Sequence, residues 1–124
     1  MKNQRPVNLD LTKFHFPITA ILSILHRISG VVLFLFSPYL LYMLQETIAS
    51  QSRFEDLAAH LNQPVMKIGV WVFLGALSLH VVAGLRHLMM DMGLGESLQT
   101  ARASSRWTLV IFVVLLILAG VWLW

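Results

Sequence analysis

The sequence predicts an all-α membrane protein with three transmembrane helices, on the basis of two observations. The chain of 124 residues is 57% hydrophobic and only 12% charged, with a mean hydropathy of +0.74. Ordinary soluble domains carry a charged fraction of about 25%. Three windows of 18 residues contain no Lys, Arg, Asp or Glu: 28–45, 68–85 and 107–124. Each window is close to the roughly 20 apolar residues that a helix needs to cross a bilayer.

The first span is expected over residues 18–46 and so starts before its uncharged window. Pro17 suits the first turn of a helix. Apolar residues continue the pattern ahead of the window, at Ile18, Ile21, Leu22 and Leu25. Pro38 lies inside this span and should kink it, because proline lacks the amide hydrogen that a helix needs.

The loop after the first span is expected to contain a short helix lying along the membrane surface. Its apolar residues follow the spacing i, i+3, i+4, i+7: Phe54, Leu57, Ala58 and Leu61. The second span is expected over 64–90, a loop with Gly93 and Gly95 follows, and the third span is expected over 104–124. Residues 1–124 are therefore interpreted as a single transmembrane domain.

The distribution of Lys and Arg predicts a cytoplasmic N-terminus and a periplasmic C-terminus. Seven basic residues lie before or at the start of the first span, or follow the second: Lys2, Arg5, Lys13, Arg27, Arg86, Arg102 and Arg106. The intervening loop has only Arg53 and Lys67, against three acidic residues. Loops rich in Lys and Arg stay inside. We therefore expect a multi-pass protein of a bacterial inner membrane.

The composition excludes several classes of site. No Cys is present, so disulfides, iron–sulfur clusters, zinc thiolate sites and covalent heme attachment are excluded within this chain. The net charge of +3 comes from basic residues scattered at the ends of the spans, which is unlike the clustered stripe that binds nucleic acid. The first 17 residues lack the apolar core and cleavage site of a secretory signal. Three helices cannot enclose a large cofactor on all sides, so a partner subunit is expected beside the lipid.

His80 lies deep inside the second uncharged window, where an unpaired imidazole is costly. Gly84 follows four residues later on the same helical face, and its missing Cβ would let a flat macrocycle lie against the backbone. This pair suggests either a heme contact, necessarily of the non-covalent b type, or a helix-packing pair. An iron-bound His80 would need its other ring nitrogen held, and Ala76 or Ser78 could supply the partner.

Further polar residues fall in the same inner half of the bilayer and could form one site with His80: Ser23, His26, Arg27, Arg86 and His87. His80 and His87 are two turns apart on one face, about 10 Å by helical rise. Ser23 precedes Arg27 by four residues, so hydroxyl and guanidinium project together as donors suited to a carbonyl oxygen or a carboxylate. The alternatives are that Arg27 and His26 are interfacial anchors and that Ser23 is a packing residue. His15 and His60 are expected to face solvent.

The chain resembles the cytochrome b membrane-anchor subunit of bacterial succinate dehydrogenase, also called complex II. Four segments carry the resemblance: RPVNLDL at 5–11, FPITA at 16–20, SILHRISG at 23–30 and HVVAGLRHLMMD at 80–91. The most specific part is the combination of Ser-x-x-His-Arg with two histidines seven residues apart. The length, the three spans and the expected orientation agree, and the resemblance runs from residue 5 to the C-terminus.

The resemblance implies a non-catalytic subunit of an enzyme complex, with no catalytic residue of its own. In that family a second three-helix anchor pairs with this one, and together they hold an iron–sulfur subunit and a flavoprotein subunit that oxidises succinate and delivers electrons to ubiquinone. By motif, His80 is implied to be the axial iron ligand of a heme b shared with the partner anchor. Ser23 and Arg27 are implied to bind ubiquinone, and His26, Arg27 and His87 to lie near the heme propionates.

Two alternatives remain open at this point. One is the anchor of a quinol:fumarate reductase, which shares the architecture. The other belongs to a different class, a heme-free membrane scaffold in which His80 and Gly84 only pack against a neighbour.

Overall fold

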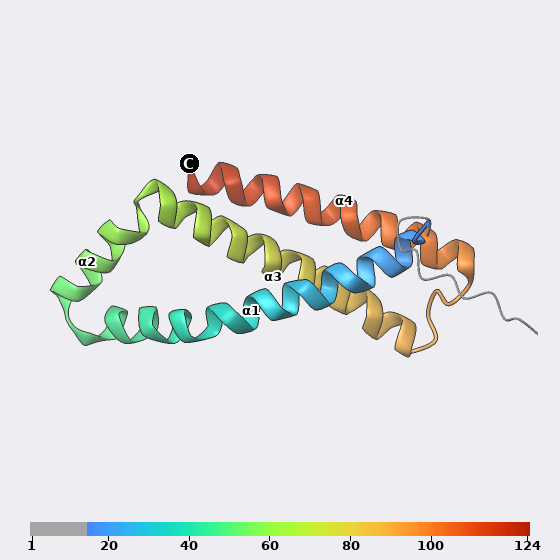
Figure 1. The fold of residues 1–124 in the computed structure, drawn as a ribbon, viewed down its shortest axis with the longest axis horizontal. Coiled ribbons are helices and arrows are strands. Elements are labelled where there is room, and N and C mark those ends of the chain that lie inside the picture. Colours follow the sequence, from blue (N-terminus) through green and yellow to red (C-terminus); the bar gives the residue numbers. More distant parts are fainter. Residues whose placement is uncertain (1–14) are drawn as a thin grey trace, which may run out of the picture.

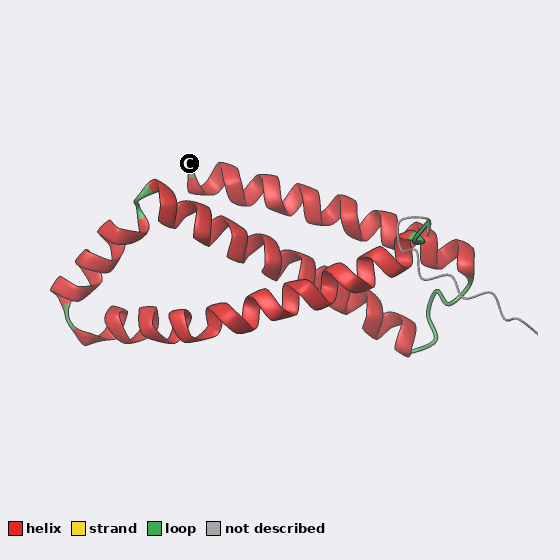
Figure 2. Ribbon diagram, viewed as in Figure 1, coloured by secondary structure: helices red, strands yellow, loops and turns green. Residues whose placement is uncertain are grey.

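The computed structural model describes residues 15–124, which form four helices and contain no strand. These are α1 (Ile18–Ala49), α2 (Gln51–Leu61), α3 (Pro64–Asp91) and α4 (Leu98–Leu123). α1, α3 and α4 are each long and apolar enough to cross a membrane. Figure 1 shows these three running alongside one another, with α2 closing one end, and Figure 2 shows how short the connecting loops are. The expectation of an all-α fold with three candidate spans is confirmed.

The start of α1 and the end of α4 lie at opposite ends of the bundle (Figure 1), as three crossings require. Which end faces the cytoplasm stays a prediction. The basic residues Lys2, Arg5 and Lys13 and the segment 5–11 lie outside the described residues.

α1 remains helical through Pro38, although its course changes direction partway along its length (Figure 1). Proline has no amide hydrogen, so the carbonyl of Phe34, four residues earlier, loses its usual helical donor. The hydroxyl of Ser37 donates to that carbonyl at 2.7 Å. Local side-chain hydrogen bonds of this kind are how a membrane helix tolerates proline, since lipid offers no replacement donor.

The short helix expected in the loop is confirmed as α2, and it begins three residues earlier than its apolar pattern. Ser50 caps its first turn by accepting a hydrogen bond from the amide of Arg53 at 3.3 Å. Arg53 also forms an ion pair with Glu46 at 3.0 Å, which ties α2 to the end of α1. Leu57 is the buried residue of α2. The position of α2 at a membrane surface stays a prediction.

α4 begins at Leu98, six residues before the expected start of the third span at Ser104. The difference arises because the helix start is set by a cap and not by hydropathy: Ser97 accepts a hydrogen bond from the amide of Thr100. Gly93 and Gly95 have φ angles of 81° and 73°, in the left-handed region that favours glycine, and so turn the chain between α3 and α4. The first two turns of α4 are therefore helical but polar.

α3 and α4 are joined by side chains of α3 that reach the backbone of α4. Lys67 donates to the carbonyl of Leu123 at 2.9 Å, which satisfies an end carbonyl of α4. Trp71 donates through its indole nitrogen to the carbonyl of Leu116, also at 2.9 Å. A Cβ at Gly75 would lie 2.8 Å from Leu116, so the absence of a side chain lets the two helices approach closely.

The bundle buries little of its own apolar surface. Its core consists of Leu22 on α1 with Leu79 and Ala83 on α3, and the side chains packed against it are Leu25, Leu109 and Phe112. In the most apolar window of each span, only 11%, 17% and 6% of the residues are buried within the chain. Most apolar side chains therefore face outward, where lipid or another helix would cover them.

Candidate functional site

Three histidine rings from α1 and α3 stack in a row near the end of the bundle where α1 begins and α3 ends. The ring centroid of His26 lies 4.3 Å from that of His80 and 5.0 Å from that of His87, and both ring pairs are inclined by 20°. The two-turn spacing of His80 and His87 places them on one face of α3, and His26 enters between them from α1. The structure thus brings these three residues into one cluster, while their roles stay predictions.

The hydrogen bonds around His80 assign its tautomer. The hydroxyl of Ser29 donates its single hydrogen to the carbonyl of His26 at 2.7 Å. The Oγ atom of Ser29 lies 3.1 Å from Nδ1 of His80, and the same carbonyl of His26 lies 3.3 Å from that nitrogen. Since the hydroxyl hydrogen is already used and a carbonyl only accepts, Nδ1 of His80 carries the hydrogen and donates. The lone pair of the neutral ring is then on Nε2.

Nε2 of His80 has no hydrogen-bond partner among residues 15–124, and it is not sealed from the surface. Neither of the two possible partners suggested by the sequence, Ala76 and Ser78, bonds to a ring nitrogen of His80, and Ser78 donates instead to the carbonyl of Leu74 on its own helix. Ser29 and the His26 carbonyl of α1 take that role. A pattern confined to α3 could not reveal a partner on another helix.

Two glycines leave room for the imidazole rings. A Cβ at Gly30 would lie 3.1 Å from Cε1 of His80, so the missing side chain allows α1 to pass close to this ring. A Cβ at Gly84 would lie 3.4 Å from Nε2 of His26. The sequence pointed to Gly84 as a place for a flat macrocycle, and in the structure the His26 ring lies against that face. Gly30 was not identified from the sequence, although it ends the same motif as Ser23 and Arg27.

The cluster contains one buried polar atom without a partner. Nε2 of His26 is buried and has no hydrogen bond among the described residues. His87 differs, because its Nδ1 lies 2.7 Å from the carbonyl of Ala83 and must donate to it. A buried nitrogen without a hydrogen bond is costly. Nε2 of His26 is therefore the atom of this cluster that would gain most from a hydrogen bond to a further polar group.

Ser23 and Arg27 lie one turn apart on α1, as the sequence predicts, but neither side chain is hydrogen-bonded to the histidine stack. Arg27 is exposed and Ser23 is half-buried. Neither side chain has a hydrogen-bond or ion-pair partner within residues 15–124. Both donors are therefore free to bind a group that approaches from outside this chain.

Arg86 does not belong to the histidine cluster, contrary to the expectation that all inner-half polar residues could form one site. Its Nε donates to Oγ of Ser104 at 3.0 Å, and its Nη2 donates to the carbonyl of Ala101 at 3.1 Å. The side chain is only 7% exposed. A residue counted from the sequence as a topology determinant thus holds α3 against the start of α4.

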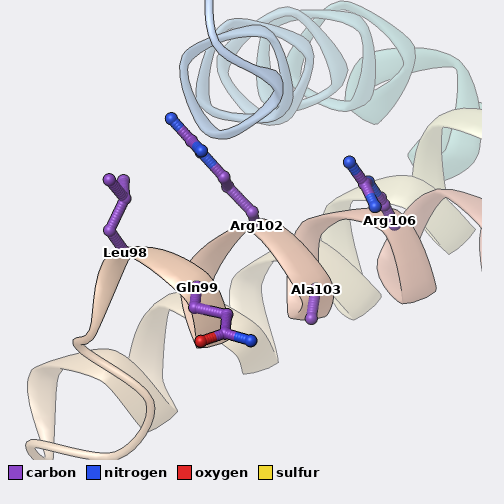
Figure 3. A pocket seen from close by; sticks show the side chains of 5 residues that line it. All are labelled: Leu98, Gln99, Arg102, Ala103 and Arg106. Atoms are coloured by element: carbon purple, nitrogen blue, oxygen red, sulfur yellow. The ribbon is translucent and has the colours of Figure 1, made fainter.

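A second group of arginines lies on α4. Arg102 and Arg106 line an open hollow of about 470 Å³, and Figure 3 shows both guanidinium groups pointing to the same side of the helix.

The two histidines outside the cluster, His15 and His60, are exposed, as expected. No group of three or more His, Cys, Asp or Glu side chains could form a metal cage within the described part of the chain.

Fold and site together define a small helical protein with three candidate membrane spans. A histidine of one span, His80 on α3, is oriented by hydrogen bonds to a second span, α1. Residues 1–119 match the family described as the succinate dehydrogenase/fumarate reductase transmembrane subunit. The chain is 49% identical, over 125 residues and all of both chains, to the succinate dehydrogenase cytochrome b556 subunit of Coxiella burnetii. It is 32% identical to that of Rickettsia typhi over 115 residues, covering 92% of this chain and 88% of the relative. With the subunit of Paracoccus denitrificans the identity is 30% over 121 residues, covering 94% and 90%.

The chain therefore belongs to the succinate dehydrogenase/fumarate reductase transmembrane subunit family. Its three apolar helices agree with the membrane location that the family description states.

Proposed function

We propose that this chain is the cytochrome b anchor subunit of a succinate:ubiquinone oxidoreductase. In this proposal it holds heme b together with a second three-helix anchor, contributes to the ubiquinone site and attaches an iron–sulfur subunit and a flavoprotein subunit to a bacterial inner membrane. The observation that carries the proposal is His80, whose Nδ1 is hydrogen-bonded while its Nε2 has no partner within the described residues, in a chain whose relatives include cytochrome b556 subunits. Catalysis belongs to the assembled complex.

The residues present fit a heme in three respects. A neutral histidine with its second nitrogen fixed by a hydrogen bond is the usual form of a metal-binding imidazole. Gly30 lets α1 pass close to the His80 ring, which keeps Nδ1 of that ring within reach of its partners on α1. Nε2 of His26 is a buried nitrogen that lacks a partner and could bond to a carboxylate such as a propionate. When bound, with His80 as the residue that would hold its iron, heme would supply one-electron storage and transfer.

The roles proposed for the other residues follow from their charge and freedom. Arg27 carries a positive charge, so it favours a propionate or a quinone oxygen that gains negative charge. The Ser23 hydroxyl is the proposed donor to a ubiquinone carbonyl. His87 is held by the Ala83 carbonyl through Nδ1, which leaves its Nε2 for the propionate region.

The proposal is tested by purifying the complex that contains the full-length chain and recording its composition and optical spectrum. We expect two soluble subunits and a second small membrane subunit to co-purify, a b-type reduced-minus-oxidised spectrum, and succinate-driven reduction of a soluble ubiquinone. Normal assembly without a b-type spectrum would support the heme-free scaffold. Fumarate reduction by quinol in preference to succinate oxidation would support the fumarate reductase anchor.

Ser29→Ala is expected to weaken heme retention by about 10-fold. Loss of a supporting partner of a metal-bound histidine typically costs 10–100-fold in affinity, and the lower end applies because the His26 carbonyl remains as an acceptor. The measurement is the rate at which heme leaves the purified complex for an excess of a heme-scavenging protein. Ser78→Ala is the matched control, because that hydroxyl bonds only within α3. Equal rates in the two variants would contradict the assigned role of Ser29.

Gly30→Val is expected to lower the heme content of the complex by displacing the His80 ring. Even a single Cβ at this position would lie within 3.1 Å of Cε1, and the ring cannot retreat without losing its hydrogen bonds to α1. Overpacking of this kind costs about 1–3 kcal/mol, or roughly 5- to 100-fold in an equilibrium constant. The heme-to-protein ratio measures the effect. Gly69→Val is the control, since nothing lies within 4 Å of a Cβ there; the same loss in both variants would contradict a steric role for Gly30.

A further inference from the structure

A groove of about 500 Å³ lies between α3 and α4, away from the histidine cluster. The end nearer the loop that joins the two helices contains the polar side chains of Arg86, Thr100 and Ser104 among apolar ones, Met89, Met90 and Leu94. The other end is apolar and is lined mainly by Val82, Leu85 and Ile111. The groove is thus mostly apolar, and its charged group lies nearer the loop than the middle of the spans.

Arg86 is the only charged side chain that lines this groove, and within residues 15–124 no Asp or Glu pairs with it. Its Nε and Nη2 are used by α4, whereas Nη1 has no partner among the described residues and is not sealed from the surface. The hydroxyls nearby are already engaged, because Ser104 donates to the Ala101 carbonyl and Thr100 bonds to Ser97. Nη1 is therefore a charged donor without a partner among residues 15–124, on a side chain that is only 7% exposed. The Thr108 hydroxyl and the Trp107 indole also line the groove and form no hydrogen bond within these residues, so Arg86 differs from them by its charge.

We propose that this groove binds an anionic phospholipid, with its phosphate on Nη1 of Arg86 and an acyl chain against the apolar end. A guanidinium without a carboxylate, buried in a candidate membrane span, calls for an anion, and phosphate matches its geometry. Arg86 lies five residues, about 7.5 Å by helical rise, before the end of α3, which is near the headgroup level. Trp107 also lines the groove and is a residue typical of the lipid interface. Basic pockets between membrane helices bind acidic headgroups elsewhere.

The test is native mass spectrometry of the purified complex after exchange into micelles containing either phosphatidylglycerol or phosphatidylcholine. We expect the wild-type complex to retain phosphatidylglycerol about 10-fold better than phosphatidylcholine, as a charge-assisted hydrogen bond requires. Arg86→Gln should reduce phosphatidylglycerol retention to the phosphatidylcholine level. Arg106→Gln is the control and should retain the preference, because Arg106 lines a different hollow (Figure 3).

Arg86→Gln also removes a contact between α3 and α4, so a second variant is needed in case it fails to assemble. Ile111→Trp keeps Arg86 and its hydrogen bonds but fills the apolar end of the groove, and it should lower phosphatidylglycerol retention to a similar extent. The proposal is overturned if the wild-type complex shows no preference between the two lipids, or if Ile111→Trp retains phosphatidylglycerol as well as the wild type does.

Discussion

Replacing His80 with alanine is expected to change the heme of the assembled complex more than any other single substitution in this chain. His80 is the cluster residue whose Nδ1 is fixed by another helix while its Nε2 has no partner among residues 15–124. His80→Ala would remove the imidazole proposed to hold the iron, so the b-type spectrum should disappear or change its form. Heme retention should fall by at least about 100-fold. Losing only the hydrogen-bond partner of a metal-bound histidine already costs up to about 100-fold in affinity, and here the histidine itself is lost. The measurements are the reduced-minus-oxidised spectrum and the heme-to-protein ratio.

His60→Ala is the matched control for this experiment. His60 is an exposed histidine on α2, at the opposite end of the bundle, so its loss removes an imidazole without touching the cluster. The control should leave the spectrum unchanged. If His80→Ala also gave the wild-type spectrum in a fully assembled complex, His80 would be a packing residue and the heme assignment would be refuted.

Arg27→Ala is expected to lower succinate-driven ubiquinone reduction by about 10- to 100-fold while leaving most of the heme in place. A hydrogen bond from a charged donor is worth about 1.5–3 kcal/mol, and the exposed Arg27 has no partner within the described residues that would otherwise consume its donors. The loss should appear mainly in quinone reduction, measured with a soluble ubiquinone. Succinate oxidation by an artificial acceptor that bypasses the membrane subunits should be retained.

Two comparisons sharpen this experiment. Arg102→Ala removes an exposed arginine of α4, a helix that begins at the end of the bundle where α1 begins (Figure 1), and it should have a much smaller effect on quinone reduction. Ser23→Ala should give a smaller loss than Arg27→Ala, and the double variant should be less than additive if both donors act on one bound quinone. Additive effects, or an equal loss with the artificial acceptor, would place Arg27 outside the quinone site.

The fold could be predicted from the sequence because its main elements depend on local composition. The three uncharged windows predicted α1, α3 and α4, since a span depends on length and hydropathy alone. The start of α4 was missed because Ser97, a capping residue in a polar stretch, decides where the helix begins. The proximity of His26, His80 and His87 followed from the direction of the spans, but the stacking order of their rings did not.

The partners of buried polar groups could not be predicted in the same way. Residue spacing within α3 suggested Ala76 or Ser78 for His80 and placed Arg86 with the histidines. In the structure His80 bonds to α1 and Arg86 bonds to α4. Which neighbour a side chain meets depends on how each helix is rotated about its axis, and a hydrophobic pattern that is apolar nearly all round does not specify that rotation.

The sequence alone established the class of the protein, a membrane chain with three spans and no cysteine. It also established that Ser23, Arg27 and the histidines of the spans lie in the same half of the spans. These properties follow from hydropathy, charge and the 3.6-residue period, which act within a single segment. The packing of α1, α3 and α4 established the rest, including the tautomer of His80, the burial of Arg86 and the groove beside it. These features depend on contacts between helices, which a single segment does not specify. The contacts require the close approach of α1 to α3 at Gly30 and of α3 to α4 at Gly75.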